Sequence, residues 1–224
     1  MRMRRKKHLE ERTDRLRDYI ILEKPLSVYR LKEHERYDII NPVEVFGNDN
    51  PVYLELGCGK GSFLAESALR NPDKNYFGVE VVPNVVVAAA EKAAELKLRN
   101  VRFLSTGAQL LHYILPESSV SGIYLNFSSP FPKKQYANSR LTYWRFLEKY
   151  RFVLKSGGWI KLKTDNVGFF DYSLESLQDN GFDIVFKTYD LYAGDVTDNI
   201  QTEYEKKFLK KDLKICALTA IMKN

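Results

Sequence analysis

A glutamate and three closely spaced glycines form the stretch of the sequence best suited to chemistry: Glu55, then Gly57, Gly59 and Gly61. Glycine permits a tight turn with positive φ and lets the backbone approach a ligand closely. Glu80 follows at the distance, about 20 residues, at which nucleotide-binding βαβ units place the acid that binds ribose hydroxyls. The spacing therefore predicts a nucleoside site, with Glu80 on the ribose.

The glycine spacing and Glu55 narrow the choice of nucleoside. The dinucleotide fingerprint G-x-G-x-x-G is not met, because the third glycine comes too early. A carboxylate two residues before the first glycine would sit badly beside a pyrophosphate, but it suits a cationic group such as the amino group of S-adenosylmethionine. The alternative is that Glu55 is an ordinary residue at the end of a strand.

Alternating strands and helices from residue 52 onward must position these side chains. This alternation is typical of a parallel sheet with helices on both faces. Ligands of such sheets lie at the carboxyl ends of the strands, where Glu55, Glu80, Ser129 and Asp165 all fall. The predicted strands are 52–56, 76–80, 101–105, 122–127, 159–163, 183–189 and 214–221, and the predicted helices are 62–69, 84–98, 107–115, 140–154 and one that ends at residue 177.

The composition describes one folded domain. A chain of 224 residues, of which 44% are hydrophobic, can bury an ample single core. We expect this domain to span residues 51–224 and residues 1–50 to form a basic arm and an irregular lead-in. The net charge of +6 suits an anionic partner without requiring one.

The same composition argues against several other classes. Cys58 and Cys216 are the only cysteines, which fits a reduced, cytoplasmic protein without a zinc cluster. The three histidines lack cysteine or carboxylate neighbours at ligand spacing, so we expect no metal. No apolar run reaches the ~18 residues of a membrane span, and no signal-peptide pattern is present. We therefore expect no membrane partner.

The chain begins with a basic arm that contains Arg2, Arg4, Arg5, Lys6 and Lys7. Terminal charge runs are often solvated tails without a partner. The alternative is an arm that binds phosphates and becomes ordered on a nucleic acid. The sequence leaves both interpretations open.

Six segments occur in the order found in the bacterial tRNA (guanine-N7-)-methyltransferases, which the sequence resembles over essentially its whole length. They are 54–61 (LELGCGKG), 78–81 (GVEV), 126–130 (NFSSP), Lys133, 164–166 (TDN) and 202–205 (TEYE). The resemblance implies a Rossmann-like α/β methyltransferase with a mostly parallel seven-stranded sheet and a C-terminal antiparallel hairpin. It also implies methyl transfer from S-adenosylmethionine to N7 of a guanine in the tRNA variable loop, by a monomer or a homodimer.

The resemblance assigns roles to individual residues. Cofactor binding falls to Glu55, Gly57, Gly59, Gly61, Glu80 and Asn126, and RNA contact to Lys133, Asp165, Thr202 and Glu205. Each RNA residue has a simpler alternative. Lys133 could be a plain surface lysine, Asp165 could cap the following helix, and Thr202 with Glu205 matches the capping-box pattern S/T-x-x-E.

The sequence departs from the family pattern in the substrate loop and beside the adenine. It reads Ser-Pro-Phe-Pro-Lys from Ser129, where the family has Asp-Pro-Trp-Pro-Lys, and Gly107 replaces a family acid. Residues that are usually basic are replaced by Gln135, Tyr136, Asn138 and Ser139. Two alternative functions follow: a tRNA-binding paralogue with weak or no activity, or a methyltransferase for another RNA or a small molecule.

Methyl transfer to guanine N7 requires few specific side-chain functions. Guanine N7 has an in-plane lone pair and no proton to lose, so no general base is required. The protein must hold N7 in line with the sulfonium methyl and stabilise the positive charge that develops on the base. The sequence therefore identifies no catalytic residue.

Overall fold

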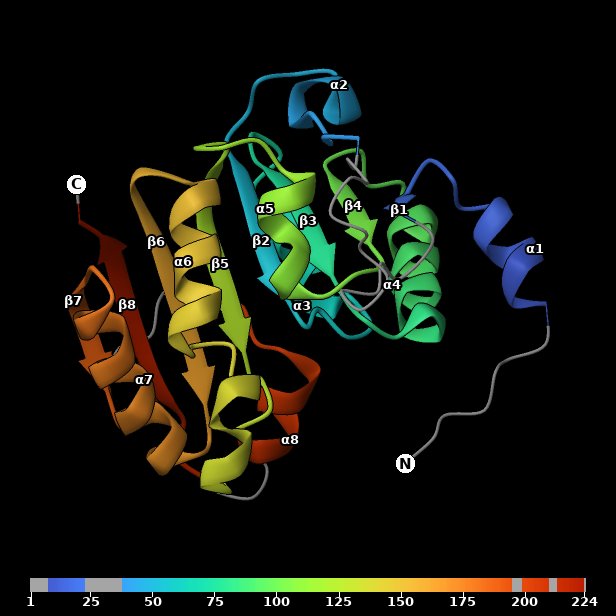
Figure 1. The fold of residues 1–224 in the computed structure, drawn as a ribbon. Coiled ribbons are helices and arrows are strands. Elements are labelled where there is room, and N and C mark those ends of the chain that lie inside the picture. The colour runs from blue at the N-terminus through green and yellow to red at the C-terminus, as the bar shows by residue number, and fades with distance from the viewer. Residues whose placement is uncertain (1–7, 23–37, 195–198, 210–212, 224) are drawn as a thin grey trace.

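A single mixed sheet organises the molecule (Figure 1). This computed structural model describes residues 8–22, 38–194, 199–209 and 213–223, so the basic arm lies outside the described residues. The strand order is β1-β4-β3-β2-β5-β6-β8-β7. The strands are β1 Ile20–Leu22, β2 Val52–Leu56, β3 Asn75–Val79, β4 Val101–Leu104, β5 Val120–Asn126, β6 Leu154–Thr164, β7 Phe182–Thr188 and β8 Cys216–Met222.

Helices cover both faces of this sheet. On one face, α5, α6 and α7 pack against the strands in a hydrophobic cluster that contains side chains such as Leu111, Leu147 and Phe170. On the other face, α3 and α4 supply Leu64 and Ala90. The helices are α1 Leu9–Asp14, α2 Pro42–Phe46, α3 Ser62–Arg70, α4 Pro83–Glu95, α5 Leu111–Ile114, α6 Trp144–Val153, α7 Val167–Asp179 and α8 Glu203–Leu209, and the 3-10 helices are η2 Ala108–Leu110 and η3 Lys134–Ser139.

The predicted fold class is confirmed, including the final hairpin. Strands β1 to β6 run parallel, and β8 pairs antiparallel with both β6 and β7. The sheet has eight strands, one more than the predicted seven. The additional strand, Ile20–Leu22, pairs with β4 at its edge.

The irregular lead-in expected before the domain contains regular structure at two places between residues 19 and 50. Ile20–Leu22 is too short to show an alternating pattern, and its partner strand lies far along the chain. Helix α2 begins with Pro42, and the side chain of Asn41 accepts a hydrogen bond from the N–H of Val43 at 3.1 Å. Proline is favoured in the first turn of a helix, so this residue marked a helix start and not a break.

The sheet order creates a crevice between β2 and β5. The chain proceeds from β2 outward through β3 and β4, and then returns to place β5 on the other side of β2. Parallel sheets bind ligands at such a reversal, outside the carboxyl ends of the strands. In Figure 1 the helix α8 lies at this edge, where the arrowheads of β5 and β6 end.

Two further observations concern the described part of the chain alone. None of its helices is long and apolar enough to cross a membrane, and no three His, Cys, Asp or Glu side chains lie together as a metal site. Cys58 and Cys216 are both buried free thiols.

Candidate active site

The loop after β2 folds around its three glycines. Gly57, Gly59 and Gly61 all have positive φ, at 77°, 54° and 71°. The N–H of Gly57 donates to the carbonyl oxygen of Val79 at 2.8 Å, which ties the loop to the end of β3. A Cβ atom on Gly61 would lie 2.9 Å from the Cβ of Ala89 in α4. Gly61 therefore also permits the close approach of α4 to the loop.

Glu80 closes the loop from the end of β3. Its Oε2 accepts from the N–H of Gly59 at 3.3 Å, and its Oε1 accepts from the N–H of Val82 at 3.0 Å. Each carboxylate oxygen can accept a second hydrogen bond. The half-buried Glu80 therefore keeps acceptor capacity for a ligand hydroxyl.

Glu55 is buried with half of its carboxylate unpaired. Its Oε1 accepts from Asn126 Nδ2 at 2.8 Å, whereas its Oε2 has no hydrogen-bond partner among the described residues. Burial raises the pKa of Glu55 to about 8, against the opposing effects of Asn126 and the Lys163 ammonium. Buried polar atoms are rarely unpaired. A cationic donor would satisfy Oε2 and favour the ionised form.

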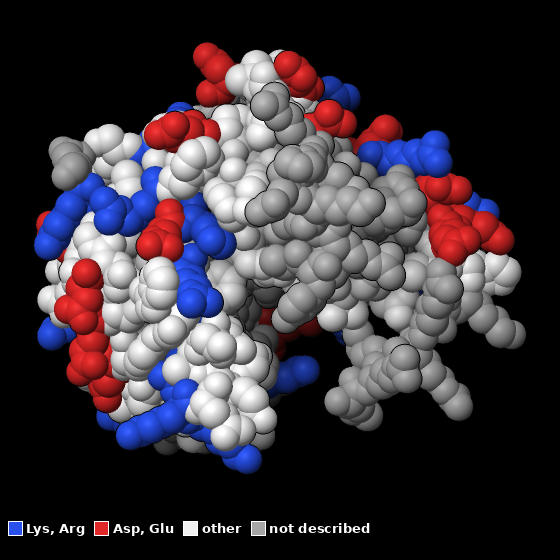
Figure 2. All heavy atoms as spheres, viewed as in Figure 1, with Lys and Arg blue, Asp and Glu red and all other residues white. Residues whose placement is uncertain are grey.

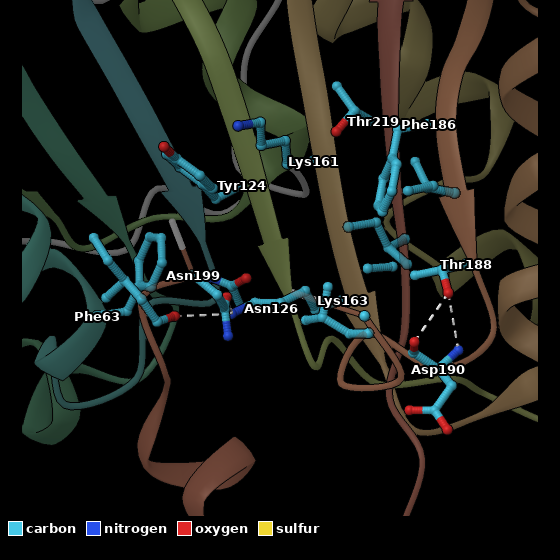
Figure 3. A pocket seen from close by; sticks show the side chains of 16 residues that line it. Phe63, Tyr124, Asn126, Lys161, Lys163, Phe186, Thr188, Asp190, Asn199 and Thr219 are labelled. Atoms are coloured by element: carbon cyan, nitrogen blue, oxygen red, sulfur yellow. Dashed lines mark hydrogen bonds between the residues drawn. The ribbon is translucent and has the colours of Figure 1, made fainter. Parts of the chain in front are cut away.

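Two cavities meet at this position. One of about 260 Å³ lies between the glycine loop and α8, with Glu55, Asn126, Thr202 and Tyr204 in its wall. The other, of about 470 Å³, lies over β5, β6, β8 and β7. Both touch Asn126 and Phe63. Figure 3 shows Asn126 and Asn199 beside Phe63 in the larger cavity, with Thr188 and Asp190 at its other end.

Thr202 and Glu205 form a reciprocal capping box at the start of α8. The Thr202 Oγ1 accepts from the N–H of Glu205 at 3.0 Å, and the N–H of Thr202 donates to Glu205 Oε2 at 3.1 Å. Both residues are buried. The structure thus shows the simpler of the two predicted arrangements, and contact with RNA stays a prediction for this pair.

Lys163, which the sequence did not single out, holds α8 in place. Its Nζ donates to Glu205 Oε2 at 2.6 Å, to Asn199 Oδ1 at 3.0 Å and to the Ile200 carbonyl oxygen at 2.9 Å. Burial lowers the pKa of Lys163, and Glu205 opposes that effect. Burial alone would raise the pKa of Glu205, but the contacts with Lys163, Tyr192 and Asn199 leave it below the ordinary value. The Lys163 ammonium and the Glu205 carboxylate thus lie together as a buried ion pair.

Comparison with known proteins decides the family. A family model described as "Putative methyltransferase" matches residues 49–218. The tRNA (guanine-N(7)-)-methyltransferase of Geobacillus sp. (strain WCH70) is 42% identical over 199 residues, which cover 86% of this chain and 90% of that protein. The Bacillus subtilis (strain 168) protein of the same name is also 42% identical, over 83% of this chain and 90% of its own. This chain belongs to the tRNA (guanine-N(7)-)-methyltransferase family.

Solved structures agree on the fold. The 16S rRNA methyltransferase KamB superposes with a TM-score of 0.63 at 15% identity, over 87% of this chain and 99% of that one. Geranyl diphosphate C-methyltransferase from Streptomyces coelicolor A3(2) gives a TM-score of 0.55 at 17% identity, over 79% and 73% of the two chains. The predicted family, methyltransferase class and S-adenosylmethionine cofactor are thereby confirmed.

The residues present fit this cofactor of the tRNA (guanine-N(7)-)-methyltransferase family. The unpaired buried Oε2 of Glu55 suits the methionine ammonium, and Asn126 holds the same carboxylate from β5. Glu80 has acceptor capacity for the ribose hydroxyls. The structure thus brings the predicted cofactor residues together across the ends of β2, β3 and β5.

The loop after β5, for which the sequence predicts a departure from the family pattern, is strained and tethered. Phe127 and Phe131 have positive φ, at 51° and 42°, which is unusual for a bulky side chain. Arg140 donates from Nη2 to the carbonyl oxygen of Phe131 at 3.0 Å and from Nε to that of Pro130 at 3.1 Å. Arg140 therefore shapes the loop, whereas Ser129 and Lys133 are exposed.

Asp165 is exposed at the end of β6. The cap of α7 is Asn166, whose side chain accepts from the N–H of Phe169 at 2.8 Å, so the helix-cap alternative for Asp165 is wrong. Asp165 accepts no hydrogen bond within the described ranges. Asp165 is therefore a carboxylate at the carboxyl edge of the sheet to which no described residue donates a hydrogen bond.

Positive charge surrounds this edge. Figure 2 shows Lys and Arg side chains around the lower end of the molecule, below the strand ends of Figure 1. Exposed lysines come from the glycine loop, from the start of η3 and the residue before it, and from α8: Lys60, Lys133, Lys134, Lys206 and Lys207. A polyanion that reached the cofactor loop would pass these charges.

Proposed function

We propose that the protein methylates N7 of a guanine in the tRNA variable loop with S-adenosylmethionine. The observation that carries the proposal is the buried, half-paired carboxylate of Glu55 between the glycine loop and Asn126. It supports the binding of an amino acid ammonium in a chain 42% identical to tRNA (guanine-N(7)-)-methyltransferases. We further propose that the protein acts in the cytoplasm as a monomer or a homodimer.

The residues at the strand ends would bind the cofactor and place it against the guanine of the tRNA. Glu55 would hold the methionine ammonium, Asn126 would fix the Glu55 carboxylate, and Glu80 would bind the ribose hydroxyls. When bound, the cofactor supplies an electrophilic sulfonium methyl. That methyl would pass from sulfur to the N7 lone pair of guanine, with S-adenosylhomocysteine as the leaving group, so the residues of the protein would be required to align the two and to exclude water.

Stabilisation of the charged guanine falls to Asp165. The attack leaves a positive charge on the base, and a preorganised carboxylate would lower the barrier. Glu205 is committed to Lys163 and to the cap of α8, whereas Asp165 is exposed and unengaged within the described residues. Ser129 can add only a dipole or a hydrogen bond. We therefore place the electrostatic role on Asp165.

The exposed lysines at this edge would bind the tRNA backbone. Contacts with phosphates fix the position of a nucleic acid and make its affinity depend on salt. Lys133 lies beside the tethered loop, and Lys206 and Lys207 project from α8. Binding through these residues should weaken steeply as salt is raised.

The test is transfer of labelled methyl from S-adenosylmethionine to unmodified tRNA, with the product identified by nucleoside mass spectrometry. We expect N7-methylguanosine in the variable loop. Tight tRNA binding without product would favour the tRNA-binding paralogue, for which the missing carboxylate at Ser129 is the supporting observation. Product on another RNA or on a small molecule, but not on tRNA, would overturn the proposed substrate.

A further inference from the structure

In the segment after β4, the side-chain carboxamide of Gln109 lies directly beside Gly107. A Cβ atom built on Gly107 would lie 2.6 Å from Cδ of Gln109 and would also collide with its Oε1 and Nε2. Gly107 has φ −100°, which any residue adopts, so the backbone does not require glycine here. The carboxamide of Gln109 thus occupies the volume that a side chain at position 107 would take.

This segment has unused hydrogen-bonding capacity. The carboxamide of Gln109 makes no hydrogen bond with the described residues. The hydroxyl groups of Ser105 and Thr106 are buried and also lack partners within the described part of the chain. Buried polar groups are normally paired, so a polar ligand beside this segment would complete it.

The order of the strands determines which part of the cofactor reaches this segment. The proposed contacts put the methionine at β2 and the ribose at β3, and β4 is the next strand. The N–H of Glu80 donates to the Leu104 carbonyl oxygen at 3.1 Å, which joins the two strand ends. Adenine is attached to the ribose on the side away from the methionine. Since strands lie about 4.8 Å apart, the base must lie over the end of β4.

We infer that Gln109 recognises the adenine of the cofactor. Its carboxamide does so from the volume that a side chain at residue 107 would otherwise occupy. This inference rests on the proposed function. The 6-amino group of adenine donates beside a ring-nitrogen acceptor, and a carboxamide offers the matching acceptor and donor. An ionised carboxylate can only accept. Gln109 therefore makes two hydrogen bonds where the family acid would make one.

The first experiment compares binding of S-adenosylhomocysteine with that of its analogue lacking the 6-amino group, by calorimetry. The unaltered protein should prefer the amino compound about tenfold, as expected for one well-formed hydrogen bond at a desolvated site. In Gln109→Ala the preference should fall to about twofold or less. Damage to folding would weaken the binding of both ligands equally. The ratio of the two affinities therefore reports only the contact between Gln109 and the 6-amino group. The matched control is Gln178→Ala, at an exposed glutamine of α7, which should keep the full preference.

A second pair of variants tests the shared volume. Gly107→Asp alone should bind S-adenosylhomocysteine at least several-fold more weakly, because the new side chain would displace the flexible carboxamide, which would then obstruct the ligand. The double variant Gly107→Asp with Gln109→Ala should bind more tightly than Gly107→Asp alone, since the obstruction is gone.

The outcomes separate the inference from the function on which it rests. If the unaltered protein binds neither ligand, the proposed function fails. If it prefers the amino compound and Gln109→Ala keeps that preference, Gln109 is not the recognising residue and the inference is overturned. The inference also fails if removal of Gln109 does not improve binding by Gly107→Asp.

Discussion

The two sides of the site use carboxylates in opposite ways. On the cofactor side, Glu55 is buried with one oxygen unpaired, and Glu80 holds the glycine loop with acceptor capacity to spare. On the side that we propose contacts RNA, Glu205 is fully buried, and its two oxygens accept from Lys163, Tyr192, Asn199 and the Thr202 N–H. A carboxylate with unused acceptors can bind a ligand, whereas a saturated one can only position what surrounds it. Family motifs do not distinguish these roles, but hydrogen bonds do.

The largest effect should follow from removal of Lys163. Lys163→Met leaves Glu205 as an unpaired buried charge, which typically costs about 3–5 kcal/mol of unfolding free energy. Chemical denaturation measures that loss. The matched control Lys155→Met, at an exposed lysine of the same strand, should change stability by less than about 0.5 kcal/mol.

A second substitution makes this prediction specific. Adding Glu205→Gln to Lys163→Met should restore part of the stability, because the buried charge is removed. If Lys163→Met were as stable as the unaltered protein, the view of Glu205 as a positioning group would be wrong.

The next largest effect concerns Asp165, the unengaged carboxylate of the RNA side. Asp165→Asn should lower the rate of methyl transfer about 10²–10³-fold, as for loss of one preorganised electrostatic group. Affinity for S-adenosylhomocysteine should be unchanged, since Asp165 lies outside the cofactor cavity. Single-turnover kinetics and calorimetry separate the two quantities. A normal rate in Asp165→Asn would show that another group stabilises the charge on the guanine, and Glu205→Gln would be the next variant to measure.

A smaller effect is expected on the cofactor side. Glu55→Gln keeps a polar side chain but removes the charge that faces the ligand ammonium. Loss of one charge-assisted hydrogen bond should weaken S-adenosylhomocysteine about 10–100-fold in calorimetry. The matched control Glu66→Gln, on the exposed side of α3, should bind normally. Equal affinities for Glu55→Gln and the control would show that Glu55 is an ordinary strand-end residue.

A final prediction concerns the dependence of stability on pH. Burial raises the pKa of Glu55 from 4.5 to about 8, so the folded protein holds this proton longer than the unfolded chain does. The contribution of Glu55 is therefore most favourable below pH 4.5 and is lost as the pH rises toward 8. Thermal unfolding of the ligand-free protein, compared with Glu55→Gln, should show this decline only when Glu55 is present. A parallel decline in both proteins would assign it to other groups.

Sequence patterns predicted the geometry of the glycine loop better than the geometry around α8, for a physical reason. The glycine loop and Glu80 are local features, whose spacing along the chain reflects their geometry in one βαβ unit. The contact between Lys163 and Glu205 joins residues 42 positions apart, and a lysine at the end of a strand resembles any surface lysine. The capping pattern of Thr202 and Glu205 did predict the arrangement that the structure shows. Burial of that pair could not be predicted, because it depends on how α8 meets the sheet.

The tether at Arg140 bears on how this loop can evolve. Arg140 holds the loop after β5 through the backbone carbonyl groups of Pro130 and Phe131, and not through the side chain at position 129. Ser129 is exposed, so an acid or a hydroxyl can be exchanged there without rebuilding the backbone. Selection can therefore tune the charge of the substrate loop by a single substitution, while the fold that presents the loop stays constant.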